Sequence, residues 1–236
     1  MKLDTETTLR DRDFARWNEE MVARYDIDRY YRKSHWVVRR IEHARIAAVA
    51  QLAAAKPGER VLEVGCGGGH VLTQFNGTAR IGIDLSPTML ARTRGRHGTD
   101  VVLIQSIAEA IPVRSSSQDV VLCTEVLEHT REPAQVISEL MRVVRPGGRV
   151  VVSIPNEGNI DRAKRILRST PVLRSLLRTL AQEDNEWHLH TFDLRMLHEI
   201  CAGRAAVDAV ISVPFPGIAV RYVALLRPLP RGGSTP

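Results

Sequence analysis

The fold of this chain is decided by residues 61–69, which read Val-Leu-Glu-Val-Gly-Cys-Gly-Gly-Gly. Val61, Leu62 and Val64 are the apolar, β-favouring run of a strand that is buried on both faces. The glycines that follow allow a tight turn and let the backbone approach a ligand closely, because they carry no Cβ. Residues 70–75 are expected to form a short helix. A strand, a glycine turn and a helix N-terminus together predict a binding site for the polar part of a nucleotide-like ligand.

The spacing of the glycines and of two acids indicates the kind of ligand. The dinucleotide fingerprint G-x-G-x-x-G needs a further glycine where this chain has His70 or Leu72. Glu63 instead lies in the first strand, and a second strand ends in Asp84, 19 residues after the first glycine. An acid at that place can accept hydrogen bonds from both hydroxyls of a ribose. The pattern therefore predicts a ligand with a nucleoside part, and it does not match the dinucleotide fingerprint.

The motif VLEVGCGGG, followed by GIDLS, resembles the first two motifs of class I S-adenosylmethionine-dependent methyltransferases. EVLEH and RVVRPGGRVVVSIPN resemble the later motifs in the same order, and the resemblance covers residues 40–155. The motifs are most similar to those of the ubiquinone-biosynthesis O-methyltransferase group. The resemblance implies S-adenosylmethionine as cofactor and methyl transfer to a small-molecule or lipid-like acceptor, at oxygen. The alternative is a catalytically silent scaffold or regulator that binds this cofactor.

The order of the expected elements predicts an α/β fold of the Rossmann-like, doubly wound type. We expect a seven-stranded sheet that is mostly parallel and ends in an antiparallel hairpin, with N-terminal helices before it and a helical insertion after the fifth strand. The strands are expected at 61–64, 80–84, 101–104, 119–123, 149–154, 206–213 and 218–226. The single domain divides into N-terminal lid helices at 1–56, the cofactor-binding core at 57–155, the insertion or substrate lid at 156–192, and the C-terminal part of the core at 193–236.

The resemblance implies cofactor contacts at motif positions along the core. Residues 108–112 resemble the adenine-binding loop of the family, but Ile107 stands where the family often has an aspartate, so only backbone contact is expected from Ile107 and Ala108. Arg40 matches an arginine that reaches the carboxylate of the cofactor; the alternative is a solvated helix-surface arginine. The full expected set is Arg40, Glu63, Gly65, Cys66, Gly67, Gly69, Asp84, Leu85, Ile107, Ala108, Glu109, Cys123 and Thr124.

Residues that act on the acceptor are expected beyond the fourth strand, because ligands of open α/β sheets bind at the carboxyl ends of strands. His129 is the candidate general base there, beside Glu125. Glu125, Glu128 and His129 could instead hold a hard divalent ion, or only order the loop. His188 and His190 alternate in an extended segment, so both can face one side, which is either the substrate pocket or the packed core.

The composition narrows the class of protein. A length of 236 residues with 44% hydrophobic residues is enough to bury one sizeable α/β core. No run of 18 apolar residues and no signal sequence is visible, and the three cysteines form neither a metal spacing nor an even disulfide set. We therefore expect a cytoplasmic protein. The net charge of +6 is spread along the chain, so nucleic acid is not the expected partner, and no oligomeric state is indicated.

The insertion is expected to contain two short amphipathic helices, at 159–169 and 172–181. Their apolar faces are flanked by arginines, including Arg162 and Arg165. Such a segment can enter the headgroup boundary of a membrane while its cations meet anionic lipid. It can equally pack its leucines over a pocket as a lid. The sequence therefore leaves two roles for residues 159–181: a substrate lid, or a peripheral contact with the inner face of the membrane.

Overall fold

The computed structural model describes residues 11–25, 35–168, 187–216 and 219–229. One sheet of seven strands has the order β3-β2-β1-β4-β5-β7-β6. Strands β1 to β5 pair in parallel, whereas β7 pairs antiparallel with both β5 and β6, which confirms the predicted fold class. The strands are β1 (Arg60–Val64), β2 (Ala79–Asp84), β3 (Val101–Gln105), β4 (Gln118–Thr124), β5 (Val144–Pro155), β6 (Ala205–Val213) and β7 (Arg221–Pro228).

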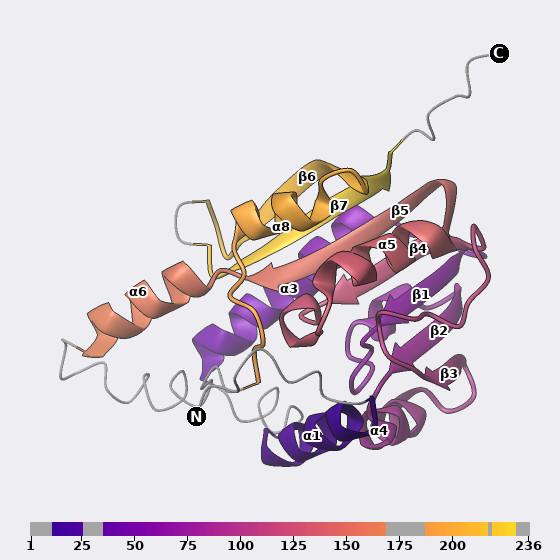
Figure 1. The fold of residues 1–236 in the computed structure, drawn as a ribbon, viewed down its shortest axis with the longest axis horizontal. Helices are drawn as coiled ribbons and strands as arrows, with labels where there is room; N and C mark the ends of the chain where they lie inside the picture. The colour runs from indigo at the N-terminus through magenta and orange to yellow at the C-terminus, as the bar shows by residue number, and fades with distance from the viewer. Residues whose placement is uncertain (1–10, 26–34, 169–186, 217–218, 230–236) are drawn as a thin grey trace.

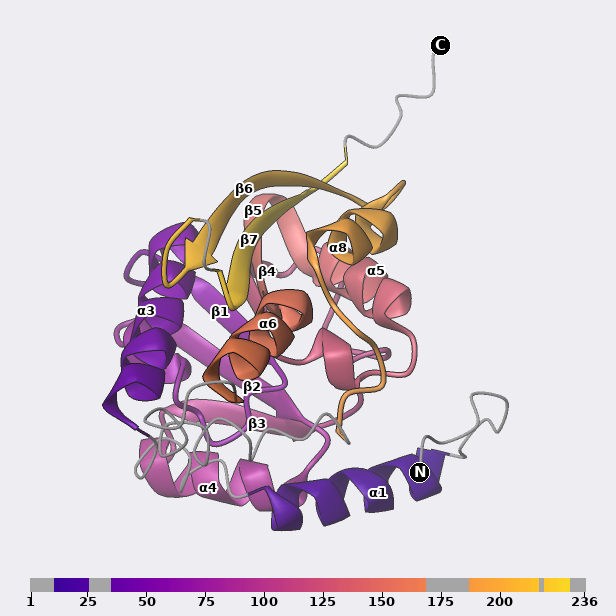
Figure 2. The ribbon, with the colours of Figure 1, turned by 90° about the vertical axis from the view of Figure 1, so that its left-hand side faces the viewer.

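Helices cover both faces of this sheet, so its central strands are buried on both sides (Figures 1 and 2). All seven residues of β4 are buried, which explains why its apolar residues 120–123 are consecutive rather than alternating with polar ones. The helices are α1 (Asp11–Arg24), α3 (Trp36–Ala53), α4 (Pro87–His97), α5 (Pro133–Val143), α6 (Glu157–Arg168) and α8 (Leu194–Cys201), with 3₁₀ turns η1 (Leu72–Phe75) and η2 (Leu127–His129).

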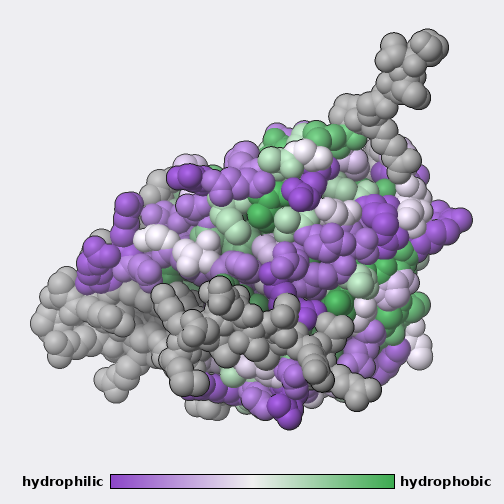
Figure 3. Space-filling model, viewed as in Figure 1, coloured by the Kyte–Doolittle hydropathy of each residue, from purple (hydrophilic) through white to green (hydrophobic). Residues whose placement is uncertain are grey.

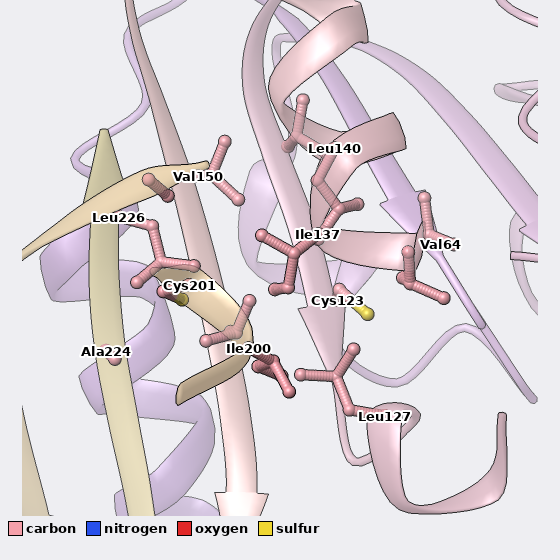
Figure 4. Packing of buried hydrophobic residues seen from close by; sticks show 14 of the residues in the cluster. Val64, Cys123, Leu127, Ile137, Leu140, Val150, Ile200, Cys201, Ala224 and Leu226 are labelled. Atoms are coloured by element: carbon pink, nitrogen blue, oxygen red, sulfur yellow. The ribbon is translucent and has the colours of Figure 1, made fainter. Parts of the chain in front are cut away.

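The main hydrophobic core lies between the sheet and the pair α5 and α8. Figure 4 shows Ile137 and Leu140 of α5 facing Cys123 of β4, with Ile200 of α8 and Leu226 of β7 beside them. Each fully buried side chain of this size contributes about 1.5–3 kcal/mol relative to its exposed state. A second cluster packs α3 against the opposite face of β1, β4 and β5. The two clusters hold helices against both faces of the sheet, and this packing fixes the positions of the side chains at the strand ends.

Two elements differ from their expected form. Residues 70–75 contain only the 3₁₀ turn η1, and the Thr73 hydroxyl donates to the His70 carbonyl oxygen at 2.7 Å, an alternative to helical bonding. Strand β5 begins at Val144 rather than at 149, because its pairing with β4 shifts register between Gln118 and Val120. Gly147 has φ +77° in this irregular part, a left-handed conformation that glycine adopts easily.

The start of the expected insertion is the helix α6, which projects away from the sheet beyond the end of β5 (Figure 1). The second expected helix of the insertion, at 172–181, falls in the range 169–186, outside the described residues. Figure 3 shows a described surface that is mostly hydrophilic in this view, with hydrophobic residues in small areas between polar ones. Within the described ranges, every helix is too short or too polar to cross a membrane.

Helix α1 lies against α4 and the loop after β4. The Thr88 hydroxyl at the start of α4 donates to Glu19 of α1 at 2.7 Å. The Arg131 guanidinium lies 4.9 Å from the centre of the Phe14 ring, within range of a cation–π contact. The N-terminal helix therefore connects the side of the sheet that carries β2 with the segment beyond β4.

Candidate active site

Three glycines of the turn after β1 have positive φ angles: +71° at Gly65, +51° at Gly67 and +74° at Gly69. A Cβ at Gly65 would lie 2.2 Å from Val126 Cγ2, and one at Gly69 would lie 2.9 Å from the His97 ring. Apart from the adjoining residues, no atom of the described part of the chain lies within 4 Å of the Cβ position at Gly67. The first and third glycines are therefore required by close packing, and the middle one leaves open space over the turn.

Most amide groups of this turn are bonded within the protein. The Gly65 and Cys66 amides donate to the Ile83 carbonyl oxygen at 2.7 and 2.9 Å, and the Gly69 amide donates to the Cys66 carbonyl oxygen at 2.8 Å. The Gly67 amide donates to Asp84 Oδ2 at 2.7 Å. The sequence predicted a helix N-terminus at this turn, but four of the five amides of residues 65–69 donate to acceptors within the protein. The turn offers close approach to its backbone, while the polar groups come from neighbouring strands.

Asp84, at the end of β2, is held from two sides. Its Oδ2 accepts from Gly67, and its Oδ1 accepts from the Ser86 amide at 2.9 Å. Burial raises the pKa of the Asp84 carboxyl to about 6, although these two backbone hydrogen bonds lower it. Each carboxylate oxygen has a second lone pair. Asp84 is therefore a fixed acceptor that can bind further hydroxyl donors.

Glu63, in β1, is 1% exposed, and its Oε2 has no hydrogen-bond partner among the described residues. Burial raises its pKa to about 8, while the nearby Arg45 guanidinium and a hydrogen bond from Thr124 act in the opposite direction. An unpaired buried acceptor costs about 1–3 kcal/mol, so this oxygen favours a donor or a cation. Among the described residues beside the glycine turn, Glu63 Oε2 is thus a buried acceptor that a donor on a ligand could satisfy.

The structure directs a different arginine toward these acids than the sequence suggested. The Arg40 side chain is exposed on α3. Arg45 is 3% exposed, its Nε lies 2.9 Å from Glu42 Oε2, and its charge acts on Glu63. Arg45 shares the buried helical face of α3 with Val49, a periodicity that the sequence contains. The arginine suited to an anionic group near Glu63 is thus Arg45.

The expected adenine loop lies beside Asp84, because the Ser106 amide donates to the Asp84 carbonyl oxygen at 3.1 Å. Ile107 and Ala108 are half-buried there. The Glu109 carboxylate accepts from the Arg131 amide at 3.0 Å, so it anchors the segment before α5. The half-buried Leu85 follows Asp84, and its carbonyl oxygen accepts from Gln105 Nε2 at 3.1 Å.

The two cysteines of the expected cofactor set are buried thiols. Cys66 packs under Gly82, where an added Cβ would lie 2.9 Å from its Sγ. Cys123 is fully buried in β4. Burial raises the pKa of both thiols above the usual range, so neither is a nucleophile. Thr124, also buried, hydrogen-bonds to Glu63.

Beyond β4, the Glu125 carboxylate is bound by the neighbouring strands. Its Oε1 accepts from the Ser153 hydroxyl at 2.8 Å, and its Oε2 lies 2.6 Å from Arg221 Nε. Glu125 has φ +54°, which is uncommon for a residue with a Cβ. Both carboxylate oxygens of Glu125 are therefore engaged with β5 and β7.

Next to Glu125 along the chain, a different set of three side chains comes together. Side-chain ligand atoms of Glu128, His129 and His188 all lie within 4.8 Å of one another. His129 Nδ1 donates to the Trp187 carbonyl oxygen at 3.1 Å, and His188 Nδ1 lies 2.6 Å from Glu157 Oε1. Each ring therefore has its Nε2 available. Of the expected group, Glu128 and His129 belong to this trio, whereas the Glu125 oxygens contact Ser153 and Arg221.

Backbone pairing explains how His188 reaches η2 across 59 residues of sequence. The Leu189 amide donates to the Glu128 carbonyl oxygen at 2.7 Å. Glu128 is 1% exposed and its Oε2 has no partner among the described residues. Burial raises the pKa of Glu128, and burial lowers that of His129 to about 3. His190 lies apart from the trio, with its Nε2 3.3 Å from the Arg131 carbonyl oxygen.

Aromatic rings cover this cluster. Trp187 stacks on Tyr25 from the end of α1, with ring centres 5.9 Å apart, and its other neighbour is His129, at 4.7 Å. Residues from the N-terminal segment and from the segment after α6 thus meet over the end of β4. The sequence contained both aromatics, but only the fold shows that they are adjacent.

Comparisons with known proteins agree with this geometry. A family described as a methyltransferase domain matches residues 62–152. The ubiquinone biosynthesis O-methyltransferase of Hahella chejuensis is 36% identical over 143 residues, which are 57% of this chain and 57% of that protein, so the match spans little more than half of the relative. The protein of the same name from Salmonella arizonae is 30% identical over 166 residues, covering 65% of this chain and 67% of the relative.

Solved structures share the fold. Magnesium protoporphyrin IX methyltransferase from Synechocystis, which contains bound SAH, has a TM-score of 0.64 over 90% of this chain and 99% of that chain, at 15% identity. The cyclase SpnF has a TM-score of 0.57 over 79% of this chain and 81% of that chain, at 18% identity. The sheet and its glycine turn therefore define a Rossmann-like methyltransferase fold. The chain belongs to the class I S-adenosylmethionine-dependent methyltransferases, whose cofactor is S-adenosylmethionine.

The residues at the strand ends fit this cofactor. Open space over Gly67 admits a ligand against the backbone. The unpaired Glu63 Oε2 suits an ammonium group, and the fixed Asp84 carboxylate suits two hydroxyls. Arg45, which is paired with Glu42, is a buried cation near Glu63 that would also attract a carboxylate. The donor set thus matches an amino-acid end and a ribose.

Proposed function

We propose that this protein transfers a methyl group from S-adenosylmethionine to a hydroxyl oxygen of a small-molecule or lipid-like acceptor. The observation that carries the proposal is the cluster of Glu128, His129 and His188 beyond β4, next to the strand ends that carry Glu63 and Asp84. Acceptors of open α/β sheets bind at this edge. The names of the O-methyltransferase relatives support oxygen as the methylated atom.

The bound cofactor would supply a sulfonium that makes its methyl group electrophilic. Glu63, Asp84 and the backbone at Gly67 would hold it in one orientation. Holding the acceptor in line with the methyl group can supply about 7–11 kcal/mol. The ring pair of Tyr25 and Trp187 would cover the acceptor and exclude water. Most of the rate would therefore come from positioning.

The acceptor hydroxyl must also lose its proton, and His129 Nε2 is placed to accept it. The Trp187 carbonyl oxygen fixes the proton on Nδ1, so the lone pair lies on Nε2. Burial lowers the pKa of His129 to about 3, so Nε2 is unprotonated at neutral pH but is a weak base, and its contribution should lie below the usual range of about 10²–10⁴-fold. Ligand atoms of Glu128 and His188 lie within 4.8 Å of a ring nitrogen of His129. Glu125 would support the loop, and His190 would hold the segment after α6 against Arg131.

The same cluster also fits a divalent transition metal, with Glu128, His129 and His188 as ligands. Two imidazoles and one carboxylate form a known ligand set for such ions. Metal-binding histidines usually donate their other N–H to a carbonyl or carboxylate, as His129 does to Trp187 and as His188 can do to Glu157. We propose this trio in place of one containing Glu125.

One experiment separates these roles. The purified protein is assayed for methyl transfer from labelled S-adenosylmethionine to a panel of phenols, quinols and lipids, before and after chelation, and its metal content is measured. For a metal site, His188→Ala removes bound metal, whereas His190→Ala, the matched control, retains it. Activity that resists chelation but falls in His129→Ala identifies a base. Cofactor binding without turnover of any acceptor would favour the silent scaffold instead.

We also propose that the protein works in the cytoplasm, with residues 159–181 as a peripheral contact to the inner face of the membrane. Of this range, the structure describes 159–168. Helix α6 projects from the sheet (Figure 1). Arg162 and Arg165 of this helix are exposed. Exposed cations on a projecting helix suit anionic lipid. A lipid-like acceptor could then enter from the membrane surface.

A further inference from the structure

Two side chains of α4 bind carbonyl groups of the glycine turn from one side. The Thr93 hydroxyl lies 2.6 Å from the Gly67 carbonyl oxygen, and His97 Nε2 lies 2.8 Å from the Gly69 carbonyl oxygen. Thr93 and His97 are four residues apart, so they share one face of the helix. A Cβ at Gly69 would lie 2.9 Å from both side chains. The helix and the turn are therefore in direct contact.

Arg80 determines the tautomer of His97. Arg80 Nη1 lies 3.4 Å from His97 Nδ1, and a guanidinium can only donate. Nδ1 therefore accepts, the ring proton is on Nε2, and Nε2 donates to Gly69. Arg80 is 9% exposed and also donates to Asn76 Oδ1 at 3.0 Å. The ring is thus held between the turn and a fixed cation.

These two hydrogen bonds select the orientation of two peptide groups. In a trans peptide the carbonyl and the following N–H point to opposite sides. Because the Gly67 carbonyl faces α4, the Gly68 N–H of the same peptide group points away from α4. The bond from His97 to the Gly69 carbonyl oxygen acts in the same way on the peptide group between Gly69 and His70. Glycines with positive φ can exchange such orientations at little cost, because no Cβ opposes it. The hydrogen bonds to the Gly67 and Gly69 carbonyl oxygens therefore favour one orientation of each peptide group.

We propose that Thr93 and His97 are positioning residues for the cofactor site, which set the affinity for S-adenosylmethionine by fixing the peptides of the glycine turn. The inference rests on the proposed function, because it requires that the turn hold this cofactor. Gly67 links the acid of β2 to helix α4: its N–H donates to Asp84, and its carbonyl oxygen accepts from Thr93. Loss of either α4 contact leaves Asp84 in place but lets the turn sample other conformations.

The test measures the dissociation constants of S-adenosylmethionine and S-adenosylhomocysteine by calorimetry. Thr93→Val keeps the shape of the side chain but loses the hydroxyl, and His97→Phe loses the ring donor. We expect each to raise both constants by about 3–10-fold, the range for one lost hydrogen bond. Thr93→Ser and His97→Gln keep a donor and should stay close to wild type. Turnover at saturating cofactor should change little.

The matched controls remove the same kind of bond elsewhere. Thr78→Val loses a hydroxyl bond to the Phe75 carbonyl oxygen, and His198→Phe loses a ring bond to the Leu194 carbonyl oxygen, both 2.7 Å long. The inference is overturned if Thr93→Val and His97→Phe lower the melting temperature but leave both constants unchanged, or if the controls weaken binding equally. If Thr93→Val does not fold, the His97 pair decides alone. Wild-type protein that binds neither ligand overturns the inference and the proposed function together, whereas binding without methyl transfer contradicts only the latter.

Discussion

The Gly67 amide nitrogen lies 2.7 Å from Asp84 Oδ2, so the turn after β1 and the acid at the end of β2 form one unit. Neither part has the geometry of the site without the other. The turn supplies close approach, and the acid both anchors the turn and retains lone pairs for a ligand. A substitution at either residue should therefore affect binding through two routes.

Replacing Asp84 by Ala should weaken cofactor binding, since it removes the acceptor for the ribose hydroxyls and releases Gly67 and Ser86. The loss should be about 1–3 kcal/mol for unpaired partners. Calorimetry measures it directly. Asp84→Asn separates the two routes, because one amide oxygen can still accept from a backbone N–H. Unchanged affinity in Asp84→Ala would exclude this residue from the site.

Glu63 should release a proton when the cofactor binds near neutral pH. Burial raises its pKa to about 8, so the free protein holds it largely protonated at pH 7, and an ammonium beside Oε2 favours the ionised form. Calorimetry in buffers of different ionisation enthalpy counts the released protons. Glu63→Gln should bind without this release. Equal proton counts in both proteins would show that Glu63 does not face the cationic part of the ligand.

The raised pKa of Glu63 also predicts how the free energy of unfolding depends on pH. The folded pKa of Glu63 lies above its ordinary value of 4.5, so between about 4.5 and 8 the folded state holds a proton that the unfolded state has lost. Its contribution to the free energy of unfolding is therefore present at low pH and is lost as pH rises through 8. Urea unfolding of the cofactor-free protein at pH 5 and pH 8 measures this change. In Glu63→Gln the decline should be smaller; an equal decline would assign it to other groups.

Glu125→Gln should lower stability without changing metal content. The carboxylate joins Ser153 and Arg221, and its loss removes the charge that lies 2.6 Å from a mostly buried guanidinium nitrogen. We expect a loss of about 1–3 kcal/mol in urea unfolding. Metal analysis of the same sample provides the contrast with His188→Ala. A metal-free Glu125→Gln protein would restore Glu125 to the ligand set.

The fold was predictable because its central strands carry apolar residues on both faces instead of alternating with polar ones. Buried stretches such as 61–64 and 119–123 need neighbours on both faces, which selects a parallel sheet with helices on each side. The glycine turn was recognisable for a related reason: Gly65 and Gly69 face side chains that leave no room for a Cβ. Both features are local, so they are visible in the sequence.

The composition of the cluster beyond β4 was not predictable, because distant partners decide it. Glu125 and Glu128 are three residues apart, yet Arg221 of β7 binds the first, while the second faces two histidines. His188 joins them through backbone bonds of the segment after the insertion to Glu128. Arg45 is a different case, since helical periodicity alone would have favoured it over Arg40.

Sedimentation with lipid vesicles at different salt concentrations distinguishes a membrane contact from a lid as the role of residues 159–181. If residues 159–181 contact the membrane, the protein should sediment with vesicles containing anionic lipid at low salt and be released as salt screens its cations within about 10 Å at 0.1 M. Arg162→Gln with Arg165→Gln should reduce binding, whereas Arg114→Gln with Arg195→Gln, equally exposed but on other elements, should not. Binding to neutral vesicles should be weak in every variant. Protein that stays in the supernatant with anionic vesicles at low salt would leave the segment as a lid and the acceptor as a soluble small molecule.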